Sequence, residues 1–415
     1  MSIDNTIACI DIWSSKIRTL IGHFDWEDKT QLNILWVWIC DSNAIRKWNI
    51  LDMEEFKSNL DKSLEEAERM AWEQVSWAFL SFNSSSLEVI NNRWIIAVSW
   101  DEITIWDVER VLDMAKNWVE LPNREILKVI PDWFVVDLEE WIKSPVWMSA
   151  RKLEVKANIF SINSNILNNI KKSVEDVWIV VYDIFPNLIS APEWILTKRQ
   201  KELWVVCIDI WSSTTWITVY EEWSLKHSCI IPIWWDNVTN DVALWVRTSI
   251  DVAEKLKIEF GQLWLEQVEN YKDFEIDLSK LSKTEDSTVS SLYLSKIIQA
   301  RYEEILYFVR EELRKIWRDG MLPEWAVLVW GWVKMKWFVE LSKEVLRLPV
   351  IVWIPFGNDS VAWTSISDPS FSGVLWTIIL ANKYRDARAK ISLNIMPMIS
   401  SMFGSIIKVL KKLLP

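Results

Sequence analysis

The sequence predicts an α/β protein made of two related lobes, and two observations lead to this fold class. The heptapeptide CIDIWSS occurs at residues 9–15 and again at 207–213. Each copy follows apolar residues and precedes a second strand-like run, KIRTLIG in the first copy and TTWITVY in the second. The chain is 50% hydrophobic and 25% charged, which is typical of a globular protein with two or more cores. A duplicated strand–turn–strand unit therefore organises the chain; a shared local turn preference is the alternative.

The usual abundances of glycine and tryptophan are reversed in this chain, because its 415 residues include 32 Trp and only 7 Gly. Glycine normally makes up about 7% of a protein. Our hypothesis is that most Trp letters stand where the folded protein needs Gly, as happens when a UGA codon decoded as glycine is translated as tryptophan. The alternative is a protein that is rich in Trp. The positions of the Trp residues discriminate between the two.

Charge, cysteines and hydropathy narrow the class of protein. With 46 basic and 58 acidic residues, the net charge of −12 argues against nucleic-acid binding. The four cysteines, Cys9, Cys40, Cys207 and Cys229, lie in apolar runs without CxxC or metal spacing, which favours a reduced, cytosolic compartment. The strand-like run IACIDI begins too early to leave room for a signal peptide, and no apolar stretch reaches the about 18 residues of a membrane-spanning helix.

The repeated turns suit phosphate binding if glycine occupies the Trp positions. A strand that ends in Asp and enters a tight turn of Gly and hydroxyl residues can offer backbone N–H groups to phosphate oxygens and the carboxylate to a metal ion. An indole at Trp13 or Trp211 would fill that space. The segments 327–337 (VLVWGWVKMKW) and 231–245 (IPIWWDNVTNDVALW) likewise become strand–turn–helix sequences when Trp is replaced by Gly.

The order of these motifs resembles the actin-type ATPases and, within them, the FtsA family of bacterial cell-division proteins. The resemblance covers nearly the whole chain and is most continuous over residues 196–261. It implies a two-lobed actin-like ATPase fold of duplicated ribonuclease-H-like domains that binds ATP and Mg²⁺. The other segments that carry it are IDIWSSKIRTLIG, VINNRWIIAVS, VIPDWFVVD, IKSPVWMSARKLEVKANIF and LPEWAVLVWGWVKMKWFVELSKEVLRLPV.

The resemblance also implies a domain order. The expected parts are a first lobe at 1–82 and 164–200, an inserted FtsA-specific subdomain at 83–163, a second-lobe core at 201–234 and 306–385, a small subdomain of the second lobe at 235–305, a linker at 386–400 and an amphipathic membrane-targeting helix at 401–415.

The same resemblance implies a set of ATP-binding residues. Asp11 and Asp209 would hold Mg²⁺ largely through water, although a strand-end Asp is also a common turn cap. Glu254 and Lys257, three apart on one helix face, match the ribose-binding pair, with a solvated helix face as the alternative. The turn at 330–333 matches the one that packs against adenosine. The full set is Asp11, Trp13, Ser14, Ser15, Lys16, Asp209, Trp211, Ser212, Ser213, Thr214, Thr215, Trp234, Trp235, Glu254, Lys257, Trp330, Gly331, Trp332 and Val333.

Hydrolysis is expected to be slow. Asn187 and Asp236 are the candidates for positioning the attacking water, and an amide such as that of Asn187 can orient water but cannot take its proton. We therefore expect at most a slow ATPase, whose nucleotide acts as a conformational and polymerisation switch.

The C-terminus has the pattern of an in-plane membrane helix. No acidic residue follows Asp386. On a helix over 401–414, apolar side chains cover about half of the circumference and lysines the rest, which favours contact with anionic lipids; a helix docked on the protein's own core is the alternative. The expected membrane residues are Met402, Phe403, Ile406, Ile407, Lys408, Leu410, Lys411, Lys412, Leu413 and Leu414.

The resemblance implies partners and a location. The small subdomain would bind the acidic C-terminal peptide of the tubulin-like protein FtsZ, with Lys296 and Arg301 as candidate contacts. Self-association into actin-like filaments, other division proteins and a peripheral place on the cytoplasmic side of the membrane at the septum are also expected. The alternatives are a PilM-like pilus-assembly adaptor and, in an enzyme class, a sugar or acetate kinase of the same fold.

Overall fold

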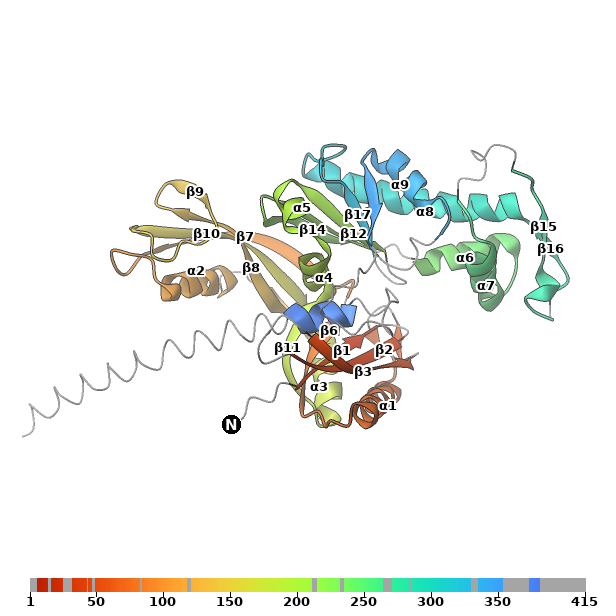
Figure 1. Cartoon of the computed structure of the whole chain (residues 1–415), viewed down its shortest axis with the longest axis horizontal. Helices are drawn as coiled ribbons and strands as arrows, with labels where there is room; N and C mark the ends of the chain where they lie inside the picture. The colour runs from red at the N-terminus through yellow and green to blue at the C-terminus, as the bar shows by residue number, and fades with distance from the viewer. Residues whose placement is uncertain are drawn as a thin grey trace, which may run out of the picture.

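The computed structural model describes residues 6–13, 16–24, 32–42, 44–46, 49–82, 84–117, 121–210, 215–231, 235–263, 271–283, 285–329, 335–353 and 373–380. These residues form two five-stranded sheets, a four-stranded sheet at one end of the molecule and a helical unit at the other (Figure 1).

The first five-stranded sheet contains the N-terminal copy of the repeat. Its strands lie in the order β11-β6-β1-β2-β3. Helices α1 (Met53–Ala71) and α3 (Ser164–Asp176) accompany it, and the two-residue strands β4 (Ile45–Arg46) and β5 (Asn49–Ile50) form a separate hairpin. The strand bounds are β1 (Thr6–Ile12), β2 (Lys16–Phe24), β3 (Leu32–Asp41), β6 (Trp77–Phe82) and β11 (Val180–Pro186).

The second five-stranded sheet repeats this topology in the order β18-β17-β12-β13-β14. The pairing register is the same in both sheets, since Asp11 lies opposite Arg18 and Ser81, and Asp209 lies opposite Trp216 and Val329. The predicted duplication is therefore confirmed. The strand bounds are β12 (Val205–Ile210), β13 (Thr215–Glu221), β14 (Ser224–Ile231), β17 (Ala326–Val329) and β18 (Val350–Val352).

One hydrophobic core joins the two sheets. Successive side chains of a strand point to opposite faces. Val205 and Cys207 of β12 therefore pack in the core that also contains β1, whereas Val206 and Ile208 pack in the second core with α8 (Ser291–Lys315). Helix α4 (Asn187–Ile195) and a helical segment at 373–380 contribute to the shared core. The two lobes are thus packed together.

The four-stranded sheet has a core of its own. Its strands lie in the order β7-β10-β8-β9, with α2 (Ile105–Asn117) packed on one face (Figure 1). Ile103, Val111 and Leu153 are fully buried in this core. The bounds are β7 (Glu88–Ala97), β8 (Arg124–Val136), β9 (Glu139–Ile142) and β10 (Lys152–Asn163).

A helical unit lies beyond the second sheet, and the long helix α8 connects the two (Figure 1). Ser290 caps α8 by accepting a hydrogen bond from the backbone N–H of Tyr293. The remaining elements are α5 (Lys198–Glu202), α6 (Trp235–Val246), α7 (Ile250–Phe260), β15 (Glu275–Asp277), η2 (Leu278–Lys280), β16 (Thr288–Ser290), α8 (Ser291–Lys315) and α9 (Phe338–Leu346).

Many Trp residues occupy backbone conformations that favour glycine. Among the described residues, nine of the 14 non-glycine residues with positive φ are Trp. A left-handed conformation costs an L-residue about 1–2 kcal/mol, whereas Gly adopts it freely. The nine are Trp72, Trp141, Trp147, Trp178, Trp204, Trp223, Trp317, Trp325 and Trp337.

Three of these Trp residues end helices at the position where glycine is favoured. Trp72 is the left-handed C-cap of α1 and donates its backbone N–H to the carbonyl of Glu68. Trp178 and Trp317 each follow the C-cap residue, of α3 and of α8, and have φ angles of 65° and 60°. The local geometry at these sites is that of glycine.

The hairpin between β13 and β14 shows the same preference. Glu222 and Trp223, its two central residues, both have positive φ, at 48° and 70°. A two-residue turn of this kind normally carries Gly at the second central position. Glycine in place of Trp223 would therefore relieve the backbone of this hairpin.

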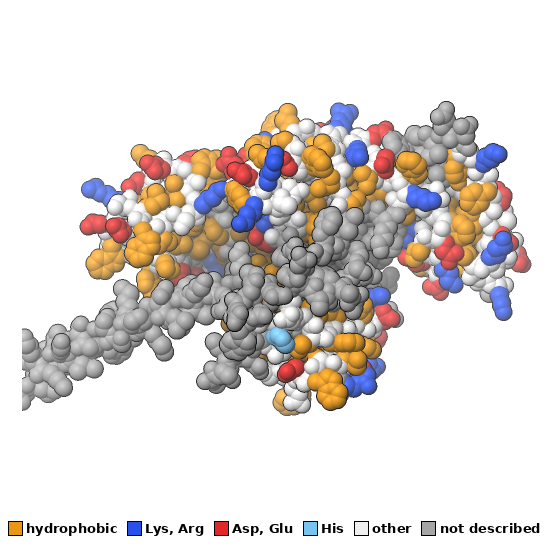
Figure 2. Space-filling view, in the orientation of Figure 1, with side chains coloured by type: hydrophobic (Ala, Val, Ile, Leu, Met, Phe, Trp, Pro, Cys, Tyr) orange, Lys and Arg blue, Asp and Glu red, His pale blue; other side chains and the backbone are white. Residues whose placement is uncertain are grey.

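The described surface mixes acidic and basic side chains, with hydrophobic side chains scattered between them (Figure 2). Several of the most exposed hydrophobic residues are Trp at positive φ, including Trp72 (92% exposed), Trp178 (90%) and Trp317 (83%). An exposed indole gains little from burial. Among the described helices, none combines the length and the apolar character needed to cross a bilayer.

Candidate functional site

Three neighbouring strands of the first sheet bring polar groups to one edge. Strands β11, β6 and β1 run parallel, so their carboxyl ends lie together. Asn187 directly follows β11. Ser81 and Asp11 are the second-to-last residues of β6 and β1. The fold thus joins groups that are 176 residues apart in the chain, Asp11 and Asn187.

The Asp11 carboxylate is fully buried in a hydrogen-bonded network. Asn187 donates from Nδ2 to Oδ1 of Asp11 at 3.3 Å, and Ser81 donates from its hydroxyl to Oδ1 of Asn187. Burial raises the pKa of Asp11, and the Arg18 charge together with the hydrogen bonds opposes that rise. The charged carboxylate at this edge therefore depends on its polar neighbours.

Trp13 occupies one side of the same carboxylate. Its indole donates from Nε1 to Oδ2 of Asp11 at 2.5 Å, and the ring itself is 7% exposed. The Arg18 guanidinium carbon lies 3.8 Å from the ring centroid. The indole therefore covers one oxygen of the buried carboxylate.

The equivalent edge of the second sheet carries Asp209. This residue is 2% exposed and lies opposite Val329, the last residue of β17. The expected adenosine turn at 330–333 follows that residue in the chain. Thr215, which begins β13, is fully buried and lies opposite Ile210, the residue that follows Asp209.

Glu254 and Lys257 form an ion pair on α7. The Lys257 side chain is fully buried and contacts both Glu254 and the Thr239 hydroxyl of α6, while Thr239 donates to Oε2 of Glu254 at 2.6 Å. Removing an ammonium group from water is expensive unless it is paired. Lys257 is therefore not part of a solvated helix face.

Many of the expected site residues lie outside the described residues. Lys16, in contrast, begins β2 and lies 3.7 Å from the Asp41 carboxylate. Trp235 and Asp236 begin α6, but their side chains are outside the described part of the chain. The expected site residues wholly outside it are Ser14, Ser15, Trp211, Ser212, Ser213, Thr214, Trp234, Trp330, Gly331, Trp332, Val333 and the membrane residues at 401–415.

Sequence reasoning did not identify Ser81, Thr239 or Gly373 as neighbours of the site. A Cβ atom placed on Gly373 would lie 2.9 Å from Oδ2 of Asp11 and 3.2 Å from Nδ2 of Asn187. The only signal in the sequence was that this Gly is one of the 7 in the chain. Its neighbours are set by long-range packing, which no local pattern encodes.

Replacing Gly373 with Ala tests this close approach. Alanine favours a helix by about 1 kcal/mol over glycine, but crowding a packed site costs about 1–3 kcal/mol. We therefore expect Gly373→Ala to lower the free energy of unfolding, measured by urea denaturation. In the Asp11→Ala background the same change should be neutral or stabilising, and equal effects in both backgrounds would contradict the contact.

The candidate peptide contacts lie along a groove of about 390 Å³ between α6 and α8. Arg301 is held there by two hydrogen bonds to Asp241, at 2.6 and 3.0 Å, and by an ion pair with Glu304. Lys296 lines the same groove. The remaining lining residues are Trp245, Tyr293, Ile297 and Ala300.

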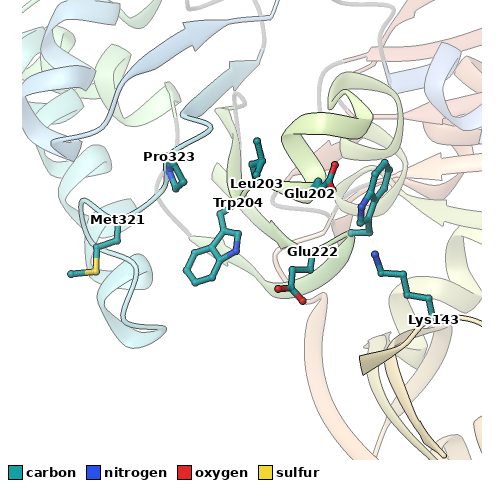
Figure 3. Close-up of a pocket in the computed structure, with 8 residues that line it drawn as sticks. Lys143, Glu202, Leu203, Trp204, Glu222, Met321 and Pro323 are labelled. Carbon is teal, nitrogen blue, oxygen red and sulfur yellow. The ribbon is translucent and has the colours of Figure 1, made fainter. Parts of the chain in front are cut away.

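A second hollow, of about 660 Å³, is lined by Trp204 and Glu222 among other residues (Figure 3). Trp204 precedes β12, whereas Asp209 lies near the other end of that strand. Two aromatic–cation contacts border it: Arg318 lies 3.6 Å from the Trp204 ring centroid, and the Lys143 ammonium lies 5.4 Å from that of Trp223. Both Trp residues have positive φ. This hollow is separate from the candidate nucleotide residues.

Solved structures of similar fold define the class of protein. The PilM–PilN type IV pilus biogenesis complex matches with a TM-score of 0.64 at 12% identity, covering 91% of this chain and 98% of that one. MreB5 of Spiroplasma citri bound to ADP matches with a TM-score of 0.52 at 11% identity, covering 93% and 99%. The two sheets of equal topology, each with a buried Asp at the same strand end, thus belong to an actin-like ATPase fold.

Sequence comparisons then give the family. A model described as the SHS2 domain inserted in FtsA matches residues 84–161, and one described as cell division protein FtsA matches residues 206–375. Cell division protein FtsA of Bacillus subtilis is 30% identical over 358 residues, which cover 86% of this chain and 80% of the relative. That of Pseudomonas aeruginosa is 28% identical over 350 residues, covering 84% and 83%. The chain belongs to the FtsA family of cell-division proteins.

Proposed function

We propose that this actin-like cell-division protein binds ATP with Mg²⁺ at the edges of the two sheets. The observation that carries the proposal is the pair Asp11 and Asp209, buried at the same position of two equivalent strands. Asp11 and Asp209 would orient the waters of Mg²⁺, which neutralises phosphate charge when bound. The buried Lys257, with Glu254, would lie toward the ribose.

The fit of the nucleotide depends on the residue at position 13. With Trp13, the Oδ2 atom of Asp11 accepts a hydrogen bond from the indole, and water cannot take that place. With glycine, that side of the carboxylate is open and the backbone can approach a phosphate. We propose that glycine is the native residue at Trp13 and Trp211, and equally at the nine Trp positions with positive φ.

We further propose that turnover is slow. The Asn187 amide, held by Ser81 and Asp11, can orient a water molecule but cannot accept its proton. The nucleotide then acts through assembly of actin-like filaments. The domain order expected from the sequence, with an inserted subdomain at 83–163 and a small subdomain at 235–305, is part of this proposal.

The cellular role that we propose is to tether FtsZ filaments to the cytoplasmic membrane at the septum. Lys296 lines the groove between α6 and α8 and would contact the acidic peptide there. The helix expected at 401–415 would supply the contact with anionic lipids, and polymerisation would raise its avidity. Both contacts must act together for tethering.

Co-sedimentation of FtsZ with anionic liposomes tests this role. The full chain with glycine at positions 13 and 211 should carry FtsZ into the pellet in the presence of ATP and Mg²⁺. A chain ending at residue 400 should leave both proteins in the supernatant, whereas Lys296→Glu should pellet alone. Lys343→Glu, on α9 and outside the groove, is the matched control and should behave as the unchanged chain.

Each outcome has a separate meaning. Equal pelleting of the chain that ends at residue 400 would contradict the membrane helix. Unchanged recruitment of FtsZ by Lys296→Glu would contradict the groove as the peptide site.

A further inference from the structure

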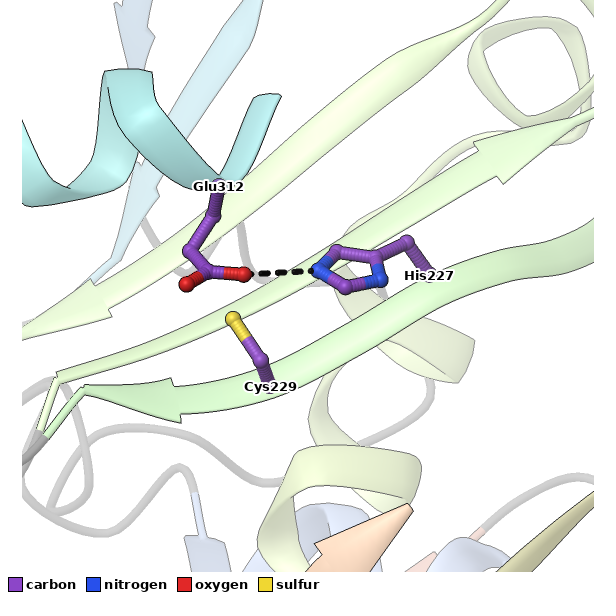
Figure 4. Close-up of side chains that lie close together, drawn as sticks. All are labelled: His227, Cys229 and Glu312. Atoms are coloured by element: carbon purple, nitrogen blue, oxygen red, sulfur yellow. Dashed lines mark hydrogen bonds and ion pairs between the residues drawn. The ribbon is translucent and has the colours of Figure 1, made fainter. Parts of the chain in front are cut away.

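Three potential metal ligands lie together between β14 and α8 (Figure 4). His227 and Cys229 are two residues apart on β14, so their side chains lie on the same face of the strand. Glu312 lies near the end of α8. Nε2 of His227 is 3.2 Å from Oε2 of Glu312, and all three ligand atoms lie within 4.8 Å of one another.

We propose that His227, Cys229 and Glu312 form a binding site for Zn²⁺ or a similar divalent transition-metal ion, with water as the fourth ligand. The donor set is one nitrogen, one sulfur and one oxygen. A thiolate and an imidazole favour such ions over Mg²⁺ and Ca²⁺, which take oxygen ligands. This site is independent of the proposed nucleotide site.

The geometry suits a tetrahedral ion. Bonds from zinc of about 2.0–2.3 Å place neighbouring ligand atoms roughly 3.3–3.6 Å apart. The His227–Glu312 separation of 3.2 Å is about 0.1 Å below this range. The Cys229 sulfur, within 4.8 Å of both, needs a shift of roughly 1.2 Å at most, which a rotation about its χ1 angle can supply.

The protonation states of His227 and Cys229 have opposite effects on metal binding, because a neutral imidazole can bind a cation directly whereas a thiol must first lose its proton. Burial lowers the pKa of His227, which leaves its imidazole in the neutral form that binds metals. Burial and the Glu312 carboxylate raise the pKa of Cys229, so the free group is a thiol. Metal binding forms the metal–sulfur bond and releases the thiol proton to the solvent.

Lys315 forms a hydrogen bond with the Glu312 carboxylate oxygen that does not face His227. Its ammonium donates to Oε1 of Glu312 at 2.5 Å, whereas Oε2 faces His227. The Lys315 side chain is 66% exposed, so its charge is screened by water. It can orient the ligand carboxylate without occupying the metal position.

A metal ion bound at this site would connect β14 to α8. Strand β14 is the edge strand of the second sheet, and α8 extends from there to the helical unit that carries the groove. A metal bridging the two elements would fix the end of α8 on the sheet. We expect the full chain to bind one equivalent of Zn²⁺ and to gain about 5 °C in Tm.

Binding of Zn²⁺ and of Co²⁺ to the full chain tests the site. Elemental analysis after dialysis should give one Zn²⁺ per chain, and bound Co²⁺ should show a thiolate charge-transfer band. Cys229→Ser and His227→Gln should each weaken binding at least about 10-fold and abolish the Tm gain. Cys40→Ser, a cysteine on β3 away from the cluster, should bind as the unchanged chain.

The spectrum of the unchanged chain keeps the test decisive even if a variant fails to fold. Absence of the thiolate band with bound Co²⁺, or absence of bound Zn²⁺, would overturn the proposal. So would equal metal binding by a folded Cys229→Ser variant.

Discussion

The chain with glycine at positions 13, 211, 330 and 332 should bind ATP at least about 100-fold more tightly than the chain with Trp, a difference of about 2.7 kcal/mol. The Trp13 indole is hydrogen-bonded to Asp11, where Mg²⁺-bound water is expected. A glycine turn allows the backbone N–H groups to approach phosphate, whereas a side chain at the turn keeps the phosphate away. Isothermal titration calorimetry in Mg²⁺ measures both affinities.

A matched control carries the same four Trp→Gly changes elsewhere, at Trp72, Trp147, Trp178 and Trp317. These residues are 74–92% exposed and have positive φ, so the fold should tolerate the changes. Affinity for ATP should stay at the level of the unchanged chain. Equal affinities for the site variant and the control would contradict the account of the phosphate turns.

The same four control substitutions should raise the free energy of unfolding by about 0.5–1 kcal/mol each. Removing the cost of the left-handed conformation stabilises the folded state by about 1–2 kcal/mol. The greater conformational freedom of glycine in the unfolded chain offsets about 0.5–1 kcal/mol of this gain. Because the sites lie on different elements, the effects should add to roughly 2–4 kcal/mol. Urea denaturation measures the sum.

Trp106→Gly is the control for stability. Trp106 is 55% exposed and lies within α2, and it is not among the residues with positive φ. Glycine in a helix costs about 1 kcal/mol relative to Ala, so this variant should be less stable. A loss of stability at the four left-handed positions, of the same size as at Trp106, would contradict the assignment of glycine.

The duplication could be predicted from the sequence because it is written as an exact local repeat. CIDIWSS places Asp11 and Asp209 at the same strand position, and the two sheets pair them in the same register. The end of α3 was not predicted, although the positive φ of Trp178 there agrees with the glycine hypothesis.

The neighbours of Asp11 could not be predicted in this way. Ser81 and Gly373 reach it through parallel strand pairing and packing of a distant helix, and neither leaves a periodic signal. The burial of Lys257 was also hidden, because an i, i+3 Glu–Lys pair has the same spacing on a solvated helix face. Only the packing of α6 against α7 distinguishes the two.

The measurement that tests the central claim most directly is tandem mass spectrometry of the protein from its own organism, on the peptides that span positions 13 and 211. We predict glycine at both positions. Tryptophan at both positions would contradict the claim, because the indoles would then occupy the two turns on which the proposed nucleotide site depends.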